Sequence, residues 1–319
     1  MNIFKTGVYC LSLLSLSAAT ANTEAVANRP QKEEMAPSKP CLKYPGDCPA
    51  FMVGGDTALA WDYFRSLPDG SFGGNSGALA SLNLVMSLKR GFGAQLGGSY
   101  GLYDWDARGS TTTENSKALQ QLGFITLGLF RMTPTCSGLN VGIVYDLMLN
   151  KKFGVFALNP ILGQVRGQLG YLIKGGNEVG VWSAVSTQTA HEETSEIPIR
   201  FRGVSQVNAY WIHYFKNSGQ MMVWAGVPYR RGLMYSSGPA GAYIVGTSFR
   251  APLTRALSLI GHASYMGARS GSAFKESSNY ASNISLGLNY SFGSCRAGQR
   301  PYLSLADNSN FIVDTNLNE

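Results

Sequence analysis

The chain has no uninterrupted apolar run long enough for a membrane-spanning helix, and it is also poor in charge. Only 14% of its 319 residues are Asp, Glu, Lys or Arg. A spanning helix needs about 20 consecutive apolar residues, which excludes a helical membrane protein. A soluble domain usually carries about 25% charged residues, so a fully water-covered surface is disfavoured as well. A chain that is poor in long apolar runs and in charged residues suits a β-barrel whose outer face contacts lipid and whose lumen contains water.

Residue types that carry chemistry are also scarce. The sequence contains three histidines and five cysteines. It shows no metal-ligand spacing, no phosphate-binding glycine loop and no context for a cysteine nucleophile, so we expect no metal and no cofactor. Its formal charge of +7 comes from scattered Lys and Arg residues rather than a basic stripe, which argues against nucleic acid as a partner.

The N-terminus has the pattern of a signal peptide over residues 1–21. Lys5 supplies the positive charge, residues 8–16 the short apolar stretch and residues 19–21 the small side chains before a cleavage site. Cleavage is expected after Ala21, with Ala27 as the second choice.

Residues 22–53 are rich in proline and charge and predict a periplasmic tether, with a partner-binding arm as the alternative. The mature chain keeps four cysteines, an even number that predicts disulfides in an oxidising compartment. Cys41 and Cys48 are the most local pair, and the connectivity that includes Cys136 and Cys295 stays open.

Residues 54–292 are dominated by segments in which apolar and polar residues alternate with a period of two, the pattern of strands with one greasy and one wet face. About twelve such segments can be counted. They cover residues 59–65, 78–88, 92–103, 119–132, 139–149, 161–171, 179–185, 204–215, 221–229, 243–249, 257–265 and 284–292.

The connections between these segments are alternately short and long. The short ones are residues 89–91, 133–138, 174–177, 216–220 and 251–256, and the long ones are residues 66–77, 104–118, 150–160, 189–203, 232–240 and 269–281. A β-sandwich, the alternative fold, has no reason to alternate in this way. The predicted fold is therefore a closed antiparallel transmembrane β-barrel of the bacterial outer-membrane type, with short periplasmic turns and both termini in the periplasm.

The last segment resembles the closing-strand signal that the bacterial barrel-assembly machinery recognises. Ser285 is followed by Gly287 and by the aromatic residues Tyr290 and Phe292. The alternation then stops, and residues 293–319 form a polar tail with a few apolar residues. We expect this periplasmic tail to dock on the periplasmic mouth of the barrel or to hang free, and the first is favoured.

Several short motifs resemble an uncharacterised family of predicted outer-membrane barrel proteins best represented in planctomycete-type bacteria. They are Leu-Gly-Leu-Phe-Arg at 127–131, Gly-Ile-Val-Tyr-Asp at 142–146, Gly-Gln-Val-Arg-Gly at 163–167, Asn-Glu-Val-Gly-Val-Trp at 177–182 and the tail at 306–316. The resemblance covers roughly residues 54–316. It implies the fold and the compartment, and it implies that the tail belongs to the protein, but it brings no activity.

Charged residues on the wet faces are the candidates for a lumen. They are Asp62, Asp146, Arg166, Arg230 and Arg250. They favour a narrow porin-like passive channel for small solutes with a mild preference for anions. The alternative is that these charges neutralise one another and fill the interior; Arg166 fits both equally well, and Arg250 fits the filling role better.

Two other functions are open. A structural barrel that anchors the envelope would not transport, and its partners, like those of a channel, would be outer-membrane lipid and the assembly machinery; the sequence indicates no oligomeric state. An outer-membrane hydrolase would need a nucleophile beside a base. His262 with Ser264 is the best pair for that role, and His191 lies in an acidic loop. We expect no enzyme.

Overall fold

The computed structural model describes a β-structure that belongs to the second of two compact units, Met1–Lys39 and Pro40–Glu319. The described residues are 52–66, 74–103, 119–133, 137–154, 157–194, 197–215, 219–233, 238–268, 280–293 and 302–316. In this part of the chain, no helix is both long and apolar enough to cross a bilayer.

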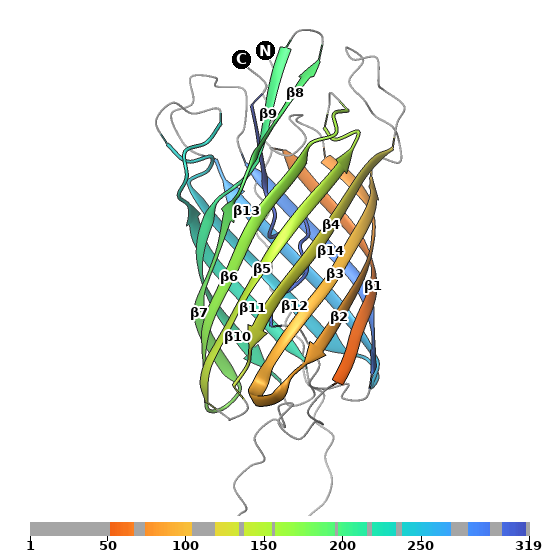
Figure 1. Cartoon of the computed structure of the whole chain (residues 1–319), viewed down its shortest axis with the longest axis vertical. Helices are drawn as coiled ribbons and strands as arrows, with labels where there is room; N and C mark the ends of the chain where they lie inside the picture. The colour runs from red at the N-terminus through yellow and green to blue at the C-terminus, as the bar shows by residue number, and fades with distance from the viewer. Residues whose placement is uncertain are drawn as a thin grey trace, which may run out of the picture. The chain divides into compact units, whose positions relative to one another are not determined.

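Twelve antiparallel strands form a closed barrel, which confirms the predicted fold and strand number (Figure 1). Each strand pairs with its neighbour along the chain, and β1 pairs with β14 to close the ring. The barrel strands are β1 (Met52–Ser66), β2 (Gly74–Ser87), β3 (Phe92–Tyr103), β4 (Gln120–Arg131), β5 (Gly138–Lys151), β6 (Ile161–Ile173), β7 (Asn177–Ser186), β10 (Gln206–Tyr214), β11 (Gln220–Pro228), β12 (Tyr243–Pro252), β13 (Leu257–Gly267) and β14 (Ala281–Gly293).

The period-two pattern of each strand sets which side chains face out. In β5 the apolar Leu139, Val141 and Ile143 are exposed, whereas Asn140 and Asp146 are completely buried. The same pattern recurs around the ring, with exposed Leu, Ile, Val, Trp and Tyr side chains on the outer face and buried Asn, Gln, Ser, Thr and Asp side chains on the inner face. The inner face also buries apolar side chains in clusters, so the feature that differs from a water-soluble protein is the exposed apolar outer face.

The connections divide the barrel into two ends. The short-turn end carries the connections β2–β3, β4–β5, β6–β7, β10–β11 and β12–β13, and the long-connection end carries the others. At the short-turn end, Arg90 and Gly91 join β2 to β3 with φ angles of 62° and 79°, and Gly175 and Gly176 join β6 to β7 with φ angles of 99° and 82°. Tight hairpin turns need such left-handed backbone, which glycine adopts without strain.

A second sheet lies at the long-connection end and was not expected from the sequence. The region predicted as a loop at 189–203 forms a hairpin of β8 (Thr189–Thr194) and β9 (Ile197–Gly203), and β15 (Val313–Asn316) pairs with β9. Figure 1 shows β8 and β9 extending beyond the barrel strands. Ile199 and Phe201 alternate with Arg200 and Arg202, so the strand signal is present in β9 but is short.

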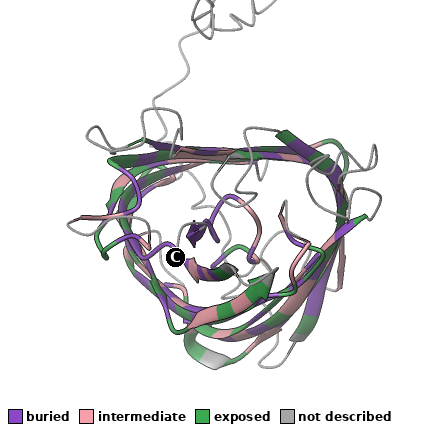
Figure 2. Ribbon diagram, turned by 90° about the horizontal axis from the view of Figure 1, so that it is seen from above, coloured by how far each residue is buried: buried purple, intermediate pink, exposed green. Residues whose placement is uncertain are grey.

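The C-terminal segment (residues 302–316) occupies a place that differs from the expectation. It was predicted to stay at the mouth with the short turns, either docked or free. Instead, Figure 2 shows the chain inside the ring of strands, and β15 ends the segment at the long-connection end. The reason is physical: the apolar residues of the tail are nearly all buried, and the lumen offers them the interior surface that a mouth does not.

We predict that Phe311→Ala loosens the C-terminal segment. Phe311 is 1% exposed, and truncating a buried Phe costs about 3–5 kcal/mol. Limited proteolysis of the refolded barrel should cut residues 302–316 at least about a hundredfold faster than in the wild type. Leu129→Ala, which removes a 61% exposed side chain from the outer wall, should leave the cleavage rate unchanged. Equal rates in wild type and Phe311→Ala would contradict the buried position of the ring.

Candidate functional site

The lumen is the candidate functional site, and the C-terminal segment runs through it from end to end. At the short-turn end, the hydroxyls of Tyr302 and Tyr210 both donate to Glu178 Oε1, at 2.7 and 2.6 Å. Asn140 Nδ2 donates to Glu178 Oε2 at 2.7 Å. Glu178 is fully buried, so this network satisfies a carboxylate that would otherwise destabilise the interior.

Halfway along the lumen, an ion pair of the wall holds the segment. Arg166 on β6 donates from Nε to Asp146 Oδ2 at 3.0 Å and from Nη2 to Asp146 Oδ1 at 3.2 Å, so the pair is bidentate. The remaining guanidinium donors reach the hydroxyl and the backbone carbonyl of Ser304, at 3.1 and 2.7 Å. Thr126 and Gln164 also donate to Asp146. Arg166 therefore neutralises Asp146 and positions the C-terminal segment.

Backbone groups of the segment are bound by other wall residues. Gln95 Nε2 donates to the carbonyl of Leu303 at 3.2 Å. The amide of Ala306 donates to Thr126 Oγ1 at 2.9 Å, and the amide of Val204 donates to the carbonyl of Ile312 at 2.8 Å. These contacts give the buried backbone of an irregular segment the partners that a strand ladder would supply.

Asp62 on β1 is the centre of a third network. It is fully buried and accepts hydrogen bonds from Tyr103 Oη at 2.7 Å, Asn283 Nδ2 at 2.8 Å and Asn308 Nδ2 at 2.7 Å. His262 Nε2 lies 3.8 Å from its carboxylate. The strands β1, β3, β13 and β14 thus meet the C-terminal segment at one carboxylate.

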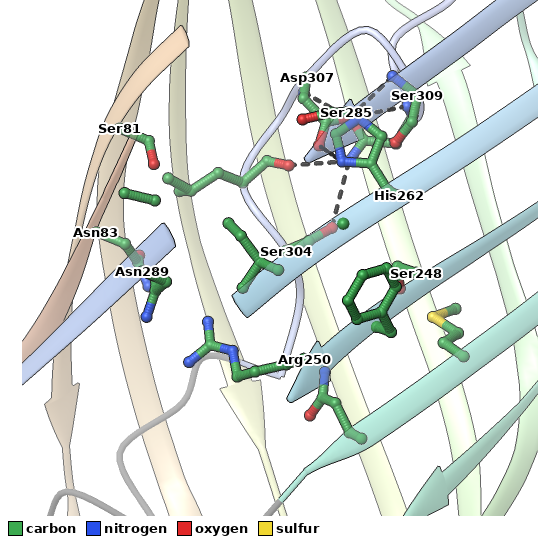
Figure 3. A pocket seen from close by; sticks show the side chains of 18 of the residues that line it. Ser81, Asn83, Ser248, Arg250, His262, Ser285, Asn289, Ser304, Asp307 and Ser309 are labelled. Carbon is green, nitrogen blue, oxygen red and sulfur yellow. Dashed lines mark hydrogen bonds and ion pairs between the residues drawn. The ribbon is translucent and has the colours of Figure 1, made fainter. Parts of the chain in front are cut away.

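The ring of His262 lies between two carboxylates. Its Nδ1 is 3.5 Å from Asp307 Oδ2, and Asp307 in turn accepts a hydrogen bond from Ser309 Oγ at 2.6 Å (Figure 3). Nucleophilic catalysis requires a hydroxyl within about 2.6–3.2 Å of the base. No hydrogen bond within the described ranges joins His262 to Ser264, and His191 lies on β8, outside the barrel wall.

An apolar layer lies across the lumen near the long-connection end. Phe311 and Val313 belong to a cluster with residues of β1, β3, β4, β5, β6 and β9, among them Phe64 and Phe124. Ile312 belongs to a second cluster with residues of β12, β13 and β14. Successive side chains of one extended segment therefore pack against opposite walls, because they point to opposite sides of the backbone.

Below this layer the lumen keeps a cavity of about 300 Å³. Its lining combines small and polar side chains of β1, β2 and β14 with larger apolar ones of β10 and β11, and the C-terminal segment forms one side. Figure 3 shows Asn83, Asn289 and Arg250 directed into this space, with His262 and Asp307 at another part of the lining. A volume of this size is at the lower limit of small-molecule pockets.

The structure brings four of the five charged candidates to the inner wall. Asp62, Asp146 and Arg166 are buried in the networks above, and Arg250 lines the cavity with its Nη2 3.8 Å from Asp56 Oδ2. Arg230 differs: it lies just past the end of β11, is exposed, and donates to the carbonyl of Ser186 at 3.1 Å. The rim position follows from β11 ending at Pro228, one residue before the end of the predicted segment at 229.

The candidates for the assembly signal lie on β14, where Ser285 faces the lumen and Tyr290 faces out. The disulfide candidates Cys41, Cys48, Cys136 and Cys295 lie outside the described residues. Groups of three or more metal-ligating side chains do not occur in the described part of the chain.

Sequence reasoning missed Glu178, Tyr302 and Asp56, which all contribute to the lumen. The sequence analysis includes Glu178 only in a family motif and does not identify it as a lumen residue, although its position next to the outward-facing Val179 predicts the inner face. Tyr302 carries no sequence signal, because its role depends on the path of the tail.

One carboxyl beyond the barrel strands is strongly perturbed. Burial raises the pKa of Asp314 to about 6, although the amide of Leu233 and the guanidinium of Arg202 act in the opposite direction. Burial likewise lowers the pKa of Arg202, whose Nη2 is 3.7 Å from Asp314 Oδ2. This pair links β15 to β9 at the long-connection end.

Fold and site together define a class: a closed twelve-stranded β-barrel whose lumen is occupied by its own C-terminal segment. A family model matches residues 53–313, and the chain belongs to that family, the Family of unknown function (DUF6666). No curated protein is significantly similar to the chain.

Several solved structures are similar in outline. An outer membrane channel from Pseudomonas putida F1 shares 11% identity over 75% of this chain and 96% of that chain, with a TM-score of 0.46. The outer membrane phospholipase A from Escherichia coli shares 10% over 74% and 95%, with a TM-score of 0.42. The TodX monoaromatic hydrocarbon channel, in a deletion mutant, shares 10% over 76% and 90%, with a TM-score of 0.44. At these values the barrel assignment rests on the strand pairing of the chain itself.

We predict that Asp146→Asn destabilises the barrel by about 3–5 kcal/mol, because it leaves the buried guanidinium of Arg166 without its charge partner. The double variant Asp146→Leu with Arg166→Met should recover most of this loss, since it removes both charges. Urea unfolding followed by tryptophan fluorescence measures the difference. A single variant as stable as the wild type would show that the pair is solvated rather than buried.

We also predict a pH dependence from Asp314. Its folded pKa of about 6 lies above the ordinary value of 3.8, so the folded chain binds the proton more tightly than the unfolded chain. This contribution to stability is complete below about pH 4 and is lost as the pH rises through about 6; its size is on the order of 3 kcal/mol.

Urea midpoints from pH 4 to pH 7 should therefore fall for the wild type relative to Asp314→Asn, which stays neutral throughout. Parallel curves for the two proteins would contradict the raised pKa.

Proposed function

We propose that the protein is an outer-membrane β-barrel whose lumen is a narrow passive channel for small solutes, closed at one end by the C-terminal segment. The membrane location is supported by the outer wall. Leu59, Leu127 and Ile143 are 64%, 58% and 55% exposed, and comparable apolar side chains cover the other strands. Soluble monomers rarely expose apolar patches above a few hundred Å², whereas a lipid-facing wall requires them.

The two ends of the barrel support an orientation. Outer-membrane barrels place short turns in the periplasm and long loops outside. The start of β1 then faces the periplasm, as expected of a chain with a leader and a tether. The last described residues, in β15, lie at the opposite end, and for this orientation we propose that they face outward. A periplasmic position of both termini, the expectation from the sequence, stays a prediction. The planctomycete-type origin stays a prediction.

A channel is supported by the polar inner wall and by the cavity below the apolar layer. Twelve strands about 4.8 Å apart and tilted by about 40° give a backbone radius of roughly 12 Å, which leaves room for a narrow lumen. The main support is that one short segment, residues 311–313, packs against opposite walls of the lumen, which would otherwise be open there. Removal of this segment would therefore open the lumen.

A structural barrel that does not transport is the second candidate. It is favoured by the number of buried networks that hold the C-terminal segment, at Glu178, Asp146 and Asp62. Such a barrel would display its surface loops and β15 without moving the segment. Catalysis has less support, because the ring nitrogens of His262 face Asp62 and Asp307.

We predict that a variant ending at Gly293 conducts ions in planar bilayers, whereas the full chain stays closed or conducts far less. The variant lacks every contact of the apolar layer made by Phe311, Ile312 and Val313. The expected result is discrete, salt-dependent conductance steps for the truncated protein. Heat-modifiable gel migration of both proteins is the control that each barrel has folded.

Two outcomes would change this conclusion. Silence of both folded proteins would favour the structural barrel. Equal conductance of both would show that the C-terminal segment does not close the lumen.

A further inference from the structure

The cavity below the apolar layer has a polar side whose hydrogen-bonding groups the protein leaves open. Ser81 on β2, Ser248 on β12 and Ser285 on β14 line it (Figure 3). Within the described ranges, none of these three hydroxyls makes a hydrogen bond. Asn289 on β14 donates from Nδ2 to Ser291 Oγ at 3.3 Å, which leaves its Oδ1 as an acceptor. Because polar groups inside a protein normally have partners, these open groups require water or a ligand in the cavity.

Two of the open groups lie on either side of a gap in the wall. In register, Ala58 on β1 is opposite Asn289 on β14 and opposite Ser81 on β2. Neighbouring strands are about 4.8 Å apart, so the two polar side chains start about 10 Å from each other with only a methyl group between them. This span fits one six-membered ring with a hydrogen bond at each end.

The opposite side of the cavity is built mainly from large apolar side chains. Trp182 on β7, Ile212 on β10 and Met222 and Trp224 on β11 line it and pack in one cluster, with Gln220 beside them. In the ring of twelve strands, β7 is six places from β1, so this patch faces the polar side across the lumen. A ligand must therefore present hydrogen-bonding groups to one side and a C–H surface to the other.

The ionisable side chains of the lining each lie beside an ionisable partner. The pairs are Arg166 with Asp146, Arg250 with Asp56, and His262 with Asp307. A charged ligand would have to displace one of these partners, and a buried charge without a partner is strongly unfavourable. The lining therefore selects a neutral ligand.

We propose that the cavity binds a neutral monosaccharide. The sugar hydroxyls exchange hydrogen bonds with Ser81, Ser248 and Asn289, and one C–H face of the ring packs on Met222 and Trp224. A sugar hydroxyl both donates and accepts, as a serine hydroxyl does, so the two sets of groups match. A cavity of about 300 Å³ is at the lower limit of small-molecule pockets, which fits one sugar ring rather than a chain of them. The inference deepens the channel by naming its solute class, and it rests on the proposed function only for how the sugar enters.

The test is calorimetric titration of the refolded full-length protein with D-glucose, D-galactose and D-mannose. At least one of them should bind at least about tenfold more tightly than D-glucuronate, which adds a charge, and than tetrahydropyran, which is the same ring without hydroxyls. Maltose, which has two rings, should bind as weakly as these analogues. Absence of binding by all three sugars, or an analogue or maltose that binds as tightly as the best sugar, would overturn the proposal.

Single substitutions test the assigned groups without disturbing the fold. Ser81→Ala and Ser248→Ala should each weaken the best sugar about threefold to tenfold and leave the urea midpoint unchanged, because neither hydroxyl bonds to the described part of the protein. Ser76→Ala, the same change on the outward face of β2, is the matched control and should bind the sugar like the wild type.

A third variant fills the gap in the wall. Ala58→Leu places a larger side chain between Ser81 and Asn289 and should weaken binding at least about tenfold, with heat-modifiable migration intact. Unchanged affinity in all three lumen variants would contradict the assigned site.

This experiment separates the two proposals. Equilibrium binding needs no conduction, so sugar binding by a protein whose truncated form stays silent would refute the channel alone. Conductance of the truncated form without sugar binding by the full chain would refute the solute alone.

Discussion

The pairing of the first strand with the last is the constraint on which the rest of the structure depends. β1 and β14 pair from Gly54 opposite Gly293 to Ser66 opposite Ala281, so no strand edge of the barrel is left open. The side chain of every wall residue then points either into the lumen or outward, and the period of two decides which. The inward positions hold Asn, Gln, Asp, Glu and Arg as well as apolar side chains, and each buried polar group needs a partner.

The C-terminal segment supplies many of those partners and is itself stabilised by them. Its hydroxyl, amide and backbone groups meet Glu178, Arg166 and Asp62 at three successive levels of the lumen. The apolar layer around Phe311 comes last, at the long-connection end. Phe311, Ile312 and Val313 fill the lumen at this end, whereas the cavity lies nearer the short turns.

Local sequence pattern was enough for the barrel wall. The alternation of apolar and polar residues in β5 and most other strands, together with the alternation of short and long connections, predicted the strands, their pairing order and their two faces. The hairpin of β8 and β9 was not predicted from the sequence, because its alternation spans only a few residues within a long connection. The position of the tail in the lumen was not predicted for a different reason. The tail has no regular apolar pattern, and its position depends on contacts with residues far away in sequence.

The candidate site shows the same division. The inward side of Asp62, Asp146, Arg166 and Arg250 follows from the period of two within one strand. The contacts between inward-facing charges cannot be predicted from the pattern within one strand. Asp56 and Arg250, for example, are brought together only when β1 pairs with β14 and the ring closes. The contact of His262 with Asp307 likewise requires the path of a segment that carries no strand signal.

Amide hydrogen exchange across residues 302–316 of the refolded full-length barrel tests the central claim most directly. The account predicts that the amides of Ala306 and of β15 exchange about as slowly as those of the barrel strands, because both are bound inside the molecule. Exchange of the whole segment at the rate of an unstructured peptide would contradict it.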